Sequence, residues 1–156
     1  MKYYYKTSDG EVVVELEQQE RLDIWSKNIV ELVIPDDCEG VWCWDNQLKK
    51  LIIPDSCKFV YCNNNQLKKL IIPDSCEIVR CSNNQLKKLI VSNACRKVWC
   101  HNNQLTELII PDSCEIVECE NNRLKELIIP DGCVWVKADT KSVTELNKVN
   151  YLDLYI

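Results

Sequence analysis

Leucine recurs every 19 residues along most of this 156-residue chain. The positions are Leu32, Leu51, Leu70, Leu89, Leu108, Leu127 and Leu146. The unit that begins at Leu70 reads LIIPDSCEIVRCSNNQLKK, and the units that begin at Leu51 and Leu108 are nearly the same. Six such units run from residue 32 to residue 145. A fixed period of this kind predicts a solenoid, in which each unit stacks on the next and buries a shared core.

Within one unit, apolar residues occupy fixed positions. In the third unit they are Cys76, Val79, Cys81, Leu86 and Leu89. Val79, Arg80 and Cys81 alternate inward, outward and inward, as the residues of a β-strand do. The Pro-Asp-Ser segment before the strand contains residue types typical of turns. Nineteen residues leave no room for a helix beside a strand and two turns, so we expect coils without helices.

The segment Cys76-x-x-Val79-x-Cys81-x-x-Asn84-x-Leu86 resembles the leucine-rich-repeat consensus L-x-x-L-x-L-x-x-N/C-x-L. The match recurs from Cys38, Cys57, Cys95 and Cys114. The chain is most similar to the short bacterial-type repeats, with cysteine in two core positions, over about four fifths of its length. The resemblance implies a leucine-rich-repeat solenoid with a parallel β-sheet on its concave face. It also implies that five asparagines bond the backbones of neighbouring coils, namely Asn46, Asn65, Asn84, Asn103 and Asn122.

The two ends of the chain depart from the repeat. We predict an N-terminal hairpin and a degenerate capping repeat over residues 1–31, six repeats over residues 32–145, and a C-terminal capping strand over residues 146–156. Tyr3–Tyr5 and Val12–Val14 flank Ser8-Asp9-Gly10, which is a signal for a tight hairpin turn. The alternating tail from Tyr151 either closes the sheet or pairs through its open edge with another chain.

The eleven cysteines fall in two columns on inward positions. The columns are Cys38, Cys57, Cys76, Cys95, Cys114 and Cys133, and Cys43, Cys62, Cys81, Cys100 and Cys119. A free cysteine behaves as a small buried hydrophobic residue, and the spacing differs from that of zinc sites. We therefore expect core packing rather than disulfides or a ladder of metal ions. Cys100 and His101 should point to opposite faces of a strand, so they cannot exchange a proton. No catalytic residue, cofactor or metal is predicted, and the chain is expected not to be an enzyme.

The outward strand positions change freely between coils, while the framework positions stay nearly constant. Aromatic residues and arginine, which are enriched at interface hot spots, occur among them. We predict that a partner protein binds at Trp42, Trp44, Tyr61, Arg80, Trp99, His101, Glu118 and Glu120. Trp42 and Tyr61 should stack, with Arg80 beside Tyr61 and Trp99 beyond it. The alternative interpretation is that aromatic residues simply favour strands.

The charge of the chain narrows the function classes further. A net charge of −5 argues against a general nucleic-acid binder, although Lys49-Lys50, Lys68-Lys69 and Lys87-Lys88 stack in three successive coils.

No segment approaches the ~18 apolar residues of a membrane span, and the first residues lack the apolar stretch of a signal peptide. We therefore expect a cytoplasmic protein.

These features favour a non-enzymatic module that binds another protein, for example a small inhibitor or adaptor. One alternative is a self-assembling structural repeat, such as a homodimer formed through the C-terminal strand. Another is a binder of anions or nucleic acid through the paired lysines. The sequence does not identify the partner.

Overall fold

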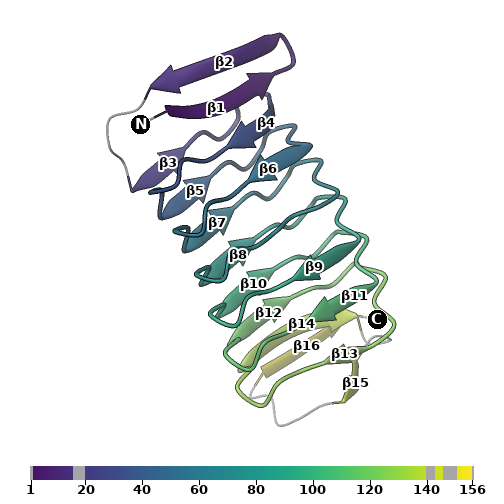
Figure 1. The fold of residues 1–156 in the computed structure, drawn as a ribbon. Helices are drawn as coiled ribbons and strands as arrows, with labels where there is room; N and C mark the ends of the chain where they lie inside the picture. Colours follow the sequence, from purple (N-terminus) through teal and green to yellow (C-terminus); the bar gives the residue numbers. More distant parts are fainter. Residues whose placement is uncertain (1, 16–19, 140–142, 146–150, 156) are drawn as a thin grey trace.

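The computed structural model describes residues 2–15, 20–139, 143–145 and 151–155 (Figure 1). These residues form sixteen β-strands and contain no helix, as the repeat length predicts. The described part of the chain therefore has no helix that is long and apolar enough to cross a membrane. The strands follow one another as stacked coils, and the coils advance steadily from the N-terminal to the C-terminal end (Figure 1).

One sheet, called the main sheet below, runs the length of the solenoid. Its eight strands are β3 (Arg21–Asp23), β5 (Gly40–Trp42), β7 (Phe59–Tyr61), β8 (Ile78–Arg80), β10 (Lys97–Trp99), β12 (Ile116–Glu118), β14 (Trp135–Asp139) and β16 (Tyr151–Tyr155). Neighbouring strands are parallel, and Val60 lies between Val41 and Val79. The register therefore places equivalent positions of successive coils side by side, which is what builds columns of side chains.

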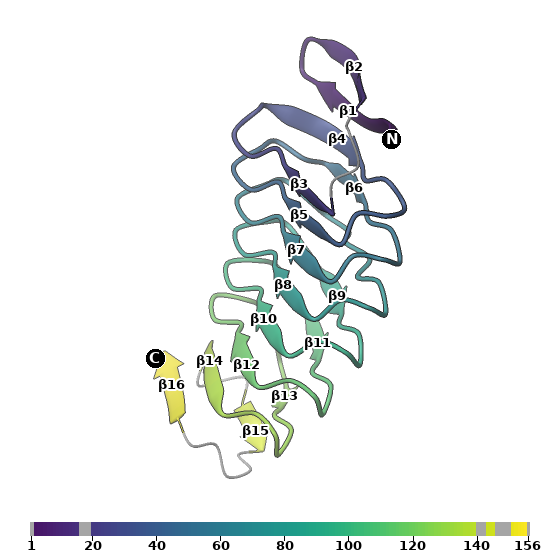
Figure 2. The same cartoon turned by 90° about the vertical axis from the view of Figure 1, so that its left-hand side faces the viewer.

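The return halves of the coils add short strands that the sequence did not predict: β4 (Ile29–Val33), β6 (Lys50–Ile52), β9 (Lys88–Ile90), β11 (Glu107–Ile109), β13 (Leu127–Ile128) and β15 (Val143–Glu145). The return segment of residues 70–72 forms no strand. The short strands pair in parallel as β4 with β6, β9 with β11 and β13 with β15. In Figure 2 they lie across the coil from the main sheet. Because Lys50, Leu51 and Ile52 alternate between exposed and buried, this half also follows the period of a strand.

The core lies between the two halves of each coil. All eleven cysteines are buried there as free thiols, which confirms their predicted inward position. The strand valines and the return leucines, such as Val79 and Leu86, are fully buried beside them. Leu22, Ile24 and Ile29 are also buried, so the core begins before the first complete repeat.

The asparagine ladder is confirmed, and Asn84 shows its geometry. Its Oδ1 accepts a hydrogen bond from the backbone N–H of Leu67 in the preceding coil, at 2.9 Å. Its Nδ2 donates to the carbonyl of Cys62 in that coil at 3.0 Å and to the carbonyl of Cys81 in its own coil at 3.1 Å. One buried amide thus connects two coils and supplies partners for backbone groups that water cannot reach.

The residue before each ladder asparagine adopts a left-handed backbone conformation. Asp45, Asn64, Asn83, Asn102 and Asn121 have φ between 54° and 56°. Asparagine and aspartate tolerate this region better than other residues with a Cβ. This explains why the exposed turn position holds only these two residue types in the five coils.

The N-terminal segment forms the predicted hairpin. Strands β1 (Lys2–Thr7) and β2 (Gly10–Glu15) are antiparallel, with Tyr3 opposite Val14 and Tyr5 opposite Val12. Strand β1 also pairs with β4, so the hairpin extends the return side of the solenoid. The buried Tyr3 ring joins the core. Residues 1 and 16–19 of the predicted capping region lie outside the described residues.

At the other end, β16 pairs in parallel with β14 and forms the edge strand of the main sheet. The tail therefore adds a strand to the sheet of its own chain. Residues 146–150 and 156 of the predicted capping segment lie outside the described residues. The boundaries predicted at residues 31 and 145 stay predictions.

Candidate functional site

The outward side chains of the main sheet form a continuous row, which we call the aromatic–arginine stripe. It consists of Arg21, Trp42, Tyr61, Arg80 and Trp99. The Trp42 and Tyr61 rings stack with their centroids 5.1 Å apart and an angle of 11° between the planes. The Arg80 guanidinium carbon lies 5.2 Å from the centroid of the Tyr61 ring and 4.4 Å from that of the Trp99 ring. The predicted order of these four side chains is therefore confirmed.

Arg21 belongs to the stripe although the sequence analysis did not include it. Its guanidinium carbon lies 3.9 Å from the centroid of the Trp42 ring. Its Nε also pairs with Asp23 Oδ2 at 3.0 Å. Arginine reaches sideways across the sheet face, so its position in the repeat frame does not reveal the contact. Each aromatic ring of the stripe consequently has a stacked ring, a guanidinium or both as its neighbour.

A second pair of stacked rings lies on the same face, two residues further along the chain than Asp23 and Trp42. Trp25 and Trp44 stack with centroids 5.9 Å apart and planes only 5° from parallel. Trp44 was predicted as a partner-binding residue and Trp25 was not. Half of the Trp25 surface is exposed, which makes it one of the most accessible aromatic side chains of the described residues.

Gly40 creates the space in which the Trp42 indole lies. A Cβ built on residue 40 would overlap Cζ3 of Trp42 and would lie 2.7 Å from its Cη2. The equivalent positions in the next two coils hold Phe59 and Ile78. Glycine at this point lets the indole fold back over its own strand while it stacks on Tyr61. Gly40 therefore positions the Trp42 indole.

Arg80 separates two shallow hollows on this face. One is about 280 Å³ and is lined by Trp42, Trp44, Tyr61, Asn63 and Arg80. The other is about 170 Å³ and is lined by Asn63, Asn64, Arg80, Ser82, Asn83, Trp99 and His101. Six of the eight predicted binding residues therefore line the same pair of hollows.

The stripe gives way to a polar cluster at the C-terminal coils. His101 and Glu118 are about three-quarters buried, with Nδ1 of His101 at 3.8 Å from Oε2 of Glu118. The prediction that Glu120 is accessible to a partner is wrong, because the residue is only 6% exposed. Its Oε1 lies 3.2 Å from Nζ of Lys137, which comes from β14 in the next coil. The position of Glu120 in the repeat predicts that its side chain points outward. It does not predict that Lys137 of the neighbouring coil covers this side chain.

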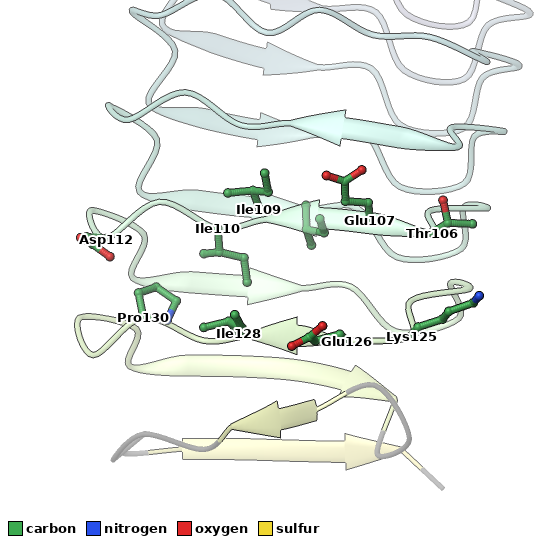
Figure 3. A pocket seen from close by; sticks show the side chains of 10 residues that line it. Thr106, Glu107, Ile109, Ile110, Asp112, Lys125, Glu126, Ile128 and Pro130 are labelled. Carbon is green, nitrogen blue, oxygen red and sulfur yellow. The ribbon is translucent and has the colours of Figure 1, made fainter.

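The opposite side of the solenoid carries a second accessible surface, the isoleucine ladder. Its members are Ile52, Ile71, Ile90, Ile109 and Ile128, which are 45% to 68% exposed. Ile109, Ile128 and Pro130 line a groove of about 450 Å³, with Glu107 and Glu126 at its border (Figure 3). The exposed isoleucines were not among the predicted binding residues. Strand alternation from the buried leucine is the signal that identifies the exposed isoleucine.

The paired lysines form an exposed flank beside this ladder. The six side chains of Lys49, Lys50, Lys68, Lys69, Lys87 and Lys88 are exposed. Nζ of Lys88 lies 3.2 Å from Glu107 of the next coil, so the charge at one end of the row is paired.

The thiols are unsuited to nucleophilic chemistry in the folded chain. Burial raises the pKa of the Cys95 thiol to about 11 and those of Cys81 and Cys114 to about 12. Burial also raises the pKa of the Cys100 thiol well above its ordinary value. A thiolate is the reactive form, and these groups are protonated at neutral pH. Cys100 is fully buried while the adjacent His101 faces the outer side, as the strand alternation predicts.

The stacked coils, the asparagine ladder and the parallel main sheet define a leucine-rich-repeat solenoid. Among solved structures, the chain is similar to YopM from Yersinia enterocolitica, with a TM-score of 0.58 and 17% identity over 78% of this chain and 34% of that one. It is also similar to YopM of Yersinia pestis, described as a leucine-rich effector protein, with a TM-score of 0.55 and 24% identity over 70% of this chain and 40% of that one. The present chain thus spans between a third and two fifths of the length of these two YopM chains. No protein-family model and no curated protein matches the chain.

Proposed function

We propose that this solenoid binds another protein through the aromatic–arginine stripe and the adjoining Trp25–Trp44 pair. The observation that supports the proposal is the stacking of Trp42 on Tyr61 and of Arg80 between Tyr61 and Trp99. Tryptophan, tyrosine and arginine are the residue types that dominate interface hot spots. Here five of them adjoin one another on one rigid sheet.

Stacking prepares the stripe for binding. A side chain that a partner must immobilise costs roughly 0.5–1.5 kcal/mol. Trp42 is already held between the Arg21 guanidinium and the Tyr61 ring, and Arg80 between the Tyr61 and Trp99 rings, so less of this cost remains to be met on association. The exposed lysines of the opposite flank, such as Lys68, have no comparable support, and immobilising them costs more.

The surface also indicates the chemistry of the partner. Flat rings interrupted by guanidinium groups suit a segment with apolar or aromatic side chains and an occasional carboxylate, because a carboxylate can pair with Arg80. Glu118, at the far end of the face, favours a basic group there. Glu120, although predicted to belong to this surface, is buried and is not part of it.

The experiment compares tagged wild-type and variant proteins as baits in the cell that produces the chain. Proteins retained by the wild type are identified by mass spectrometry, and the affinity of the purified partner is then measured. Trp42→Ala and Trp99→Ala should each cost about 2 kcal/mol or more of binding. Lys68→Ala is the matched control on the opposite flank, and we expect it to bind as the wild type does.

Normal partner binding by both tryptophan variants would contradict the proposal. If Ile90→Ser abolishes the same interaction, the partner docks on the isoleucine ladder instead. Unchanged thermal unfolding of each variant establishes that the loss concerns the surface and not the fold.

The biological role that fits such a module is that of a small adaptor or inhibitor, and the YopM chains of the same fold include one described as an effector protein. We expect no catalytic activity and a cytoplasmic location. Self-association through the outer edge of β16 predicts that the apparent mass rises with protein concentration. Anion binding through the paired lysines predicts an affinity that falls steeply with added salt.

A further inference from the structure

His101, Glu118 and Glu120 bring three potential metal ligands together at the C-terminal end of the main-sheet face. One ligand atom of each residue lies within 4.8 Å of the ligand atoms of the other two. His101 comes from one coil and both glutamates come from the next, so the stacking of coils creates the cluster. We propose that this cluster binds a divalent first-row transition metal ion, namely Zn²⁺.

The second observation that supports a metal is an unpaired oxygen of Glu120. Oε1 of this carboxylate pairs with Lys137, whereas Oε2 is buried and has no hydrogen-bond partner among the residues that the structure describes. Buried polar atoms are almost always paired, because an unpaired one forfeits its hydration without compensation. A cation held between Glu120 and its two neighbours supplies the missing partner.

The donor set selects the kind of ion. An imidazole nitrogen with two carboxylate oxygens suits Zn²⁺, whereas Ca²⁺ and Mg²⁺ prefer sites made of oxygen only. Bonds of about 2.0–2.2 Å to Zn²⁺ place tetrahedral ligand atoms roughly 3.4 Å apart. His101 and Glu118 retain some exposure, so small rotations of their side chains can close the cluster around the ion. Water can occupy the fourth position from the exposed side.

The surroundings of the cluster favour a cation. Oγ of Ser82 lies 3.1 Å from Nδ1 of His101. Nδ1 is also the ring nitrogen that lies 3.8 Å from Oε2 of Glu118, so it is the atom that would bind the metal, with the ring proton on Nε2. The two glutamates and Asp139 contribute three carboxylates, while Lys137 contributes one ammonium group on the same face. Asp139 already accepts a hydrogen bond from the backbone N–H of Asn121 at 3.1 Å, so it stabilises the turn. The carboxylates available to the metal are therefore those of Glu118 and Glu120.

The test uses the whole chain, with Zn²⁺ in isothermal titration calorimetry and Co²⁺ in visible absorption. We expect one equivalent to bind, and the Co²⁺ complex to show d–d bands without a sulfur-to-cobalt charge-transfer band. His101→Ala and Glu120→Gln should each weaken binding at least about tenfold, because loss of even an outer partner of a ligand commonly costs that much. Glu115→Gln makes the same chemical change in the same coil outside the cluster, and it should bind as the wild type does.

Several results would overturn the assignment. They are the absence of Zn²⁺ binding, a Zn²⁺ affinity in the His101 and Glu120 variants equal to that of the wild type, a thiolate charge-transfer band, or Ca²⁺ binding as tightly as Zn²⁺. Thermal unfolding in the presence of a chelator establishes that each variant is folded. If Glu120→Gln does not fold, the affinity of His101→Ala for Zn²⁺ decides the test. Zn²⁺ should raise the melting temperature of the wild type and of Glu115→Gln only. Neither measurement involves the partner protein, so the metal site and the proposed binding face succeed or fail separately.

Discussion

Replacing Asn84 by alanine is the most direct perturbation of the asparagine ladder. The change removes the acceptor of the Leu67 N–H at 2.9 Å and the donor to the Cys62 carbonyl at 3.0 Å. Both groups belong to the preceding coil, and Asn84 itself is only 8% exposed, so water does not replace the lost partner easily. A buried polar group without a partner costs about 1–3 kcal/mol, and two such groups give an expected loss of about 2–6 kcal/mol in the free energy of unfolding.

The neighbouring Asn83 provides the matched control. Its amide makes exposed bonds to Asn64 at 2.7 Å and to Asn102 at 2.8 Å. Its φ of 55° would add strain to an alanine variant, so glycine is the appropriate replacement. We expect Asn83→Gly to cost less than about 1 kcal/mol, because only surface bonds are lost. Asn83→Ala should lie between the two, because it adds the strain of the left-handed conformation.

Urea unfolding followed by circular dichroism measures these differences through the transition midpoint and the slope. Equal midpoints for Asn84→Ala and Asn83→Gly would refute the view that the buried amide, and not the surface amide, holds adjacent coils together. A changed slope in one variant only would show that the solenoid no longer unfolds as a unit, which is a known property of repeat proteins.

The remaining predictions concern the thiols and Gly40. Thiol titration should find few reactive groups before unfolding and eleven after it, because all the cysteines are buried; early reaction of several thiols would contradict the core assignment. Burial raises the pKa of the Cys95 thiol from 9.0 to about 11, so this thiol loses its proton at a lower pH in the unfolded chain than in the folded chain. The free energy of unfolding should therefore be highest below pH 9 and should fall as the pH rises from 9 towards 11, less steeply in Cys95→Ala; equal slopes in urea titrations would count against this. Gly40→Ala should displace the Trp42 indole, change tryptophan fluorescence and weaken partner binding without unfolding the chain; an unchanged spectrum would show that the indole does not need this space.

The aromatic–arginine stripe shows how far a repeat allows side-chain contacts to be predicted. In a parallel solenoid, residues 19 positions apart are neighbours, so the stacking of Trp42 on Tyr61 follows from the period. The place of Arg80 between Tyr61 and Trp99 follows in the same way. Arg21 could not be placed by this rule, because its long side chain crosses from one column to another.

The sequence by itself determined the period, the inward and outward positions, the absence of helices in the coils and the role of the ladder asparagines. The first three follow from local alternation and from the steric limits of a 19-residue coil, and the role of the asparagines follows from the resemblance to leucine-rich repeats. The tertiary structure alone decided how deeply an outward side chain is covered. It buried Glu120 beside Lys137. It also paired β1 with β4 and showed that Gly40 makes room for the Trp42 ring. Coverage depends on the side chains of adjacent coils and on the path of the chain ends, and neither is contained in the pattern of a single repeat.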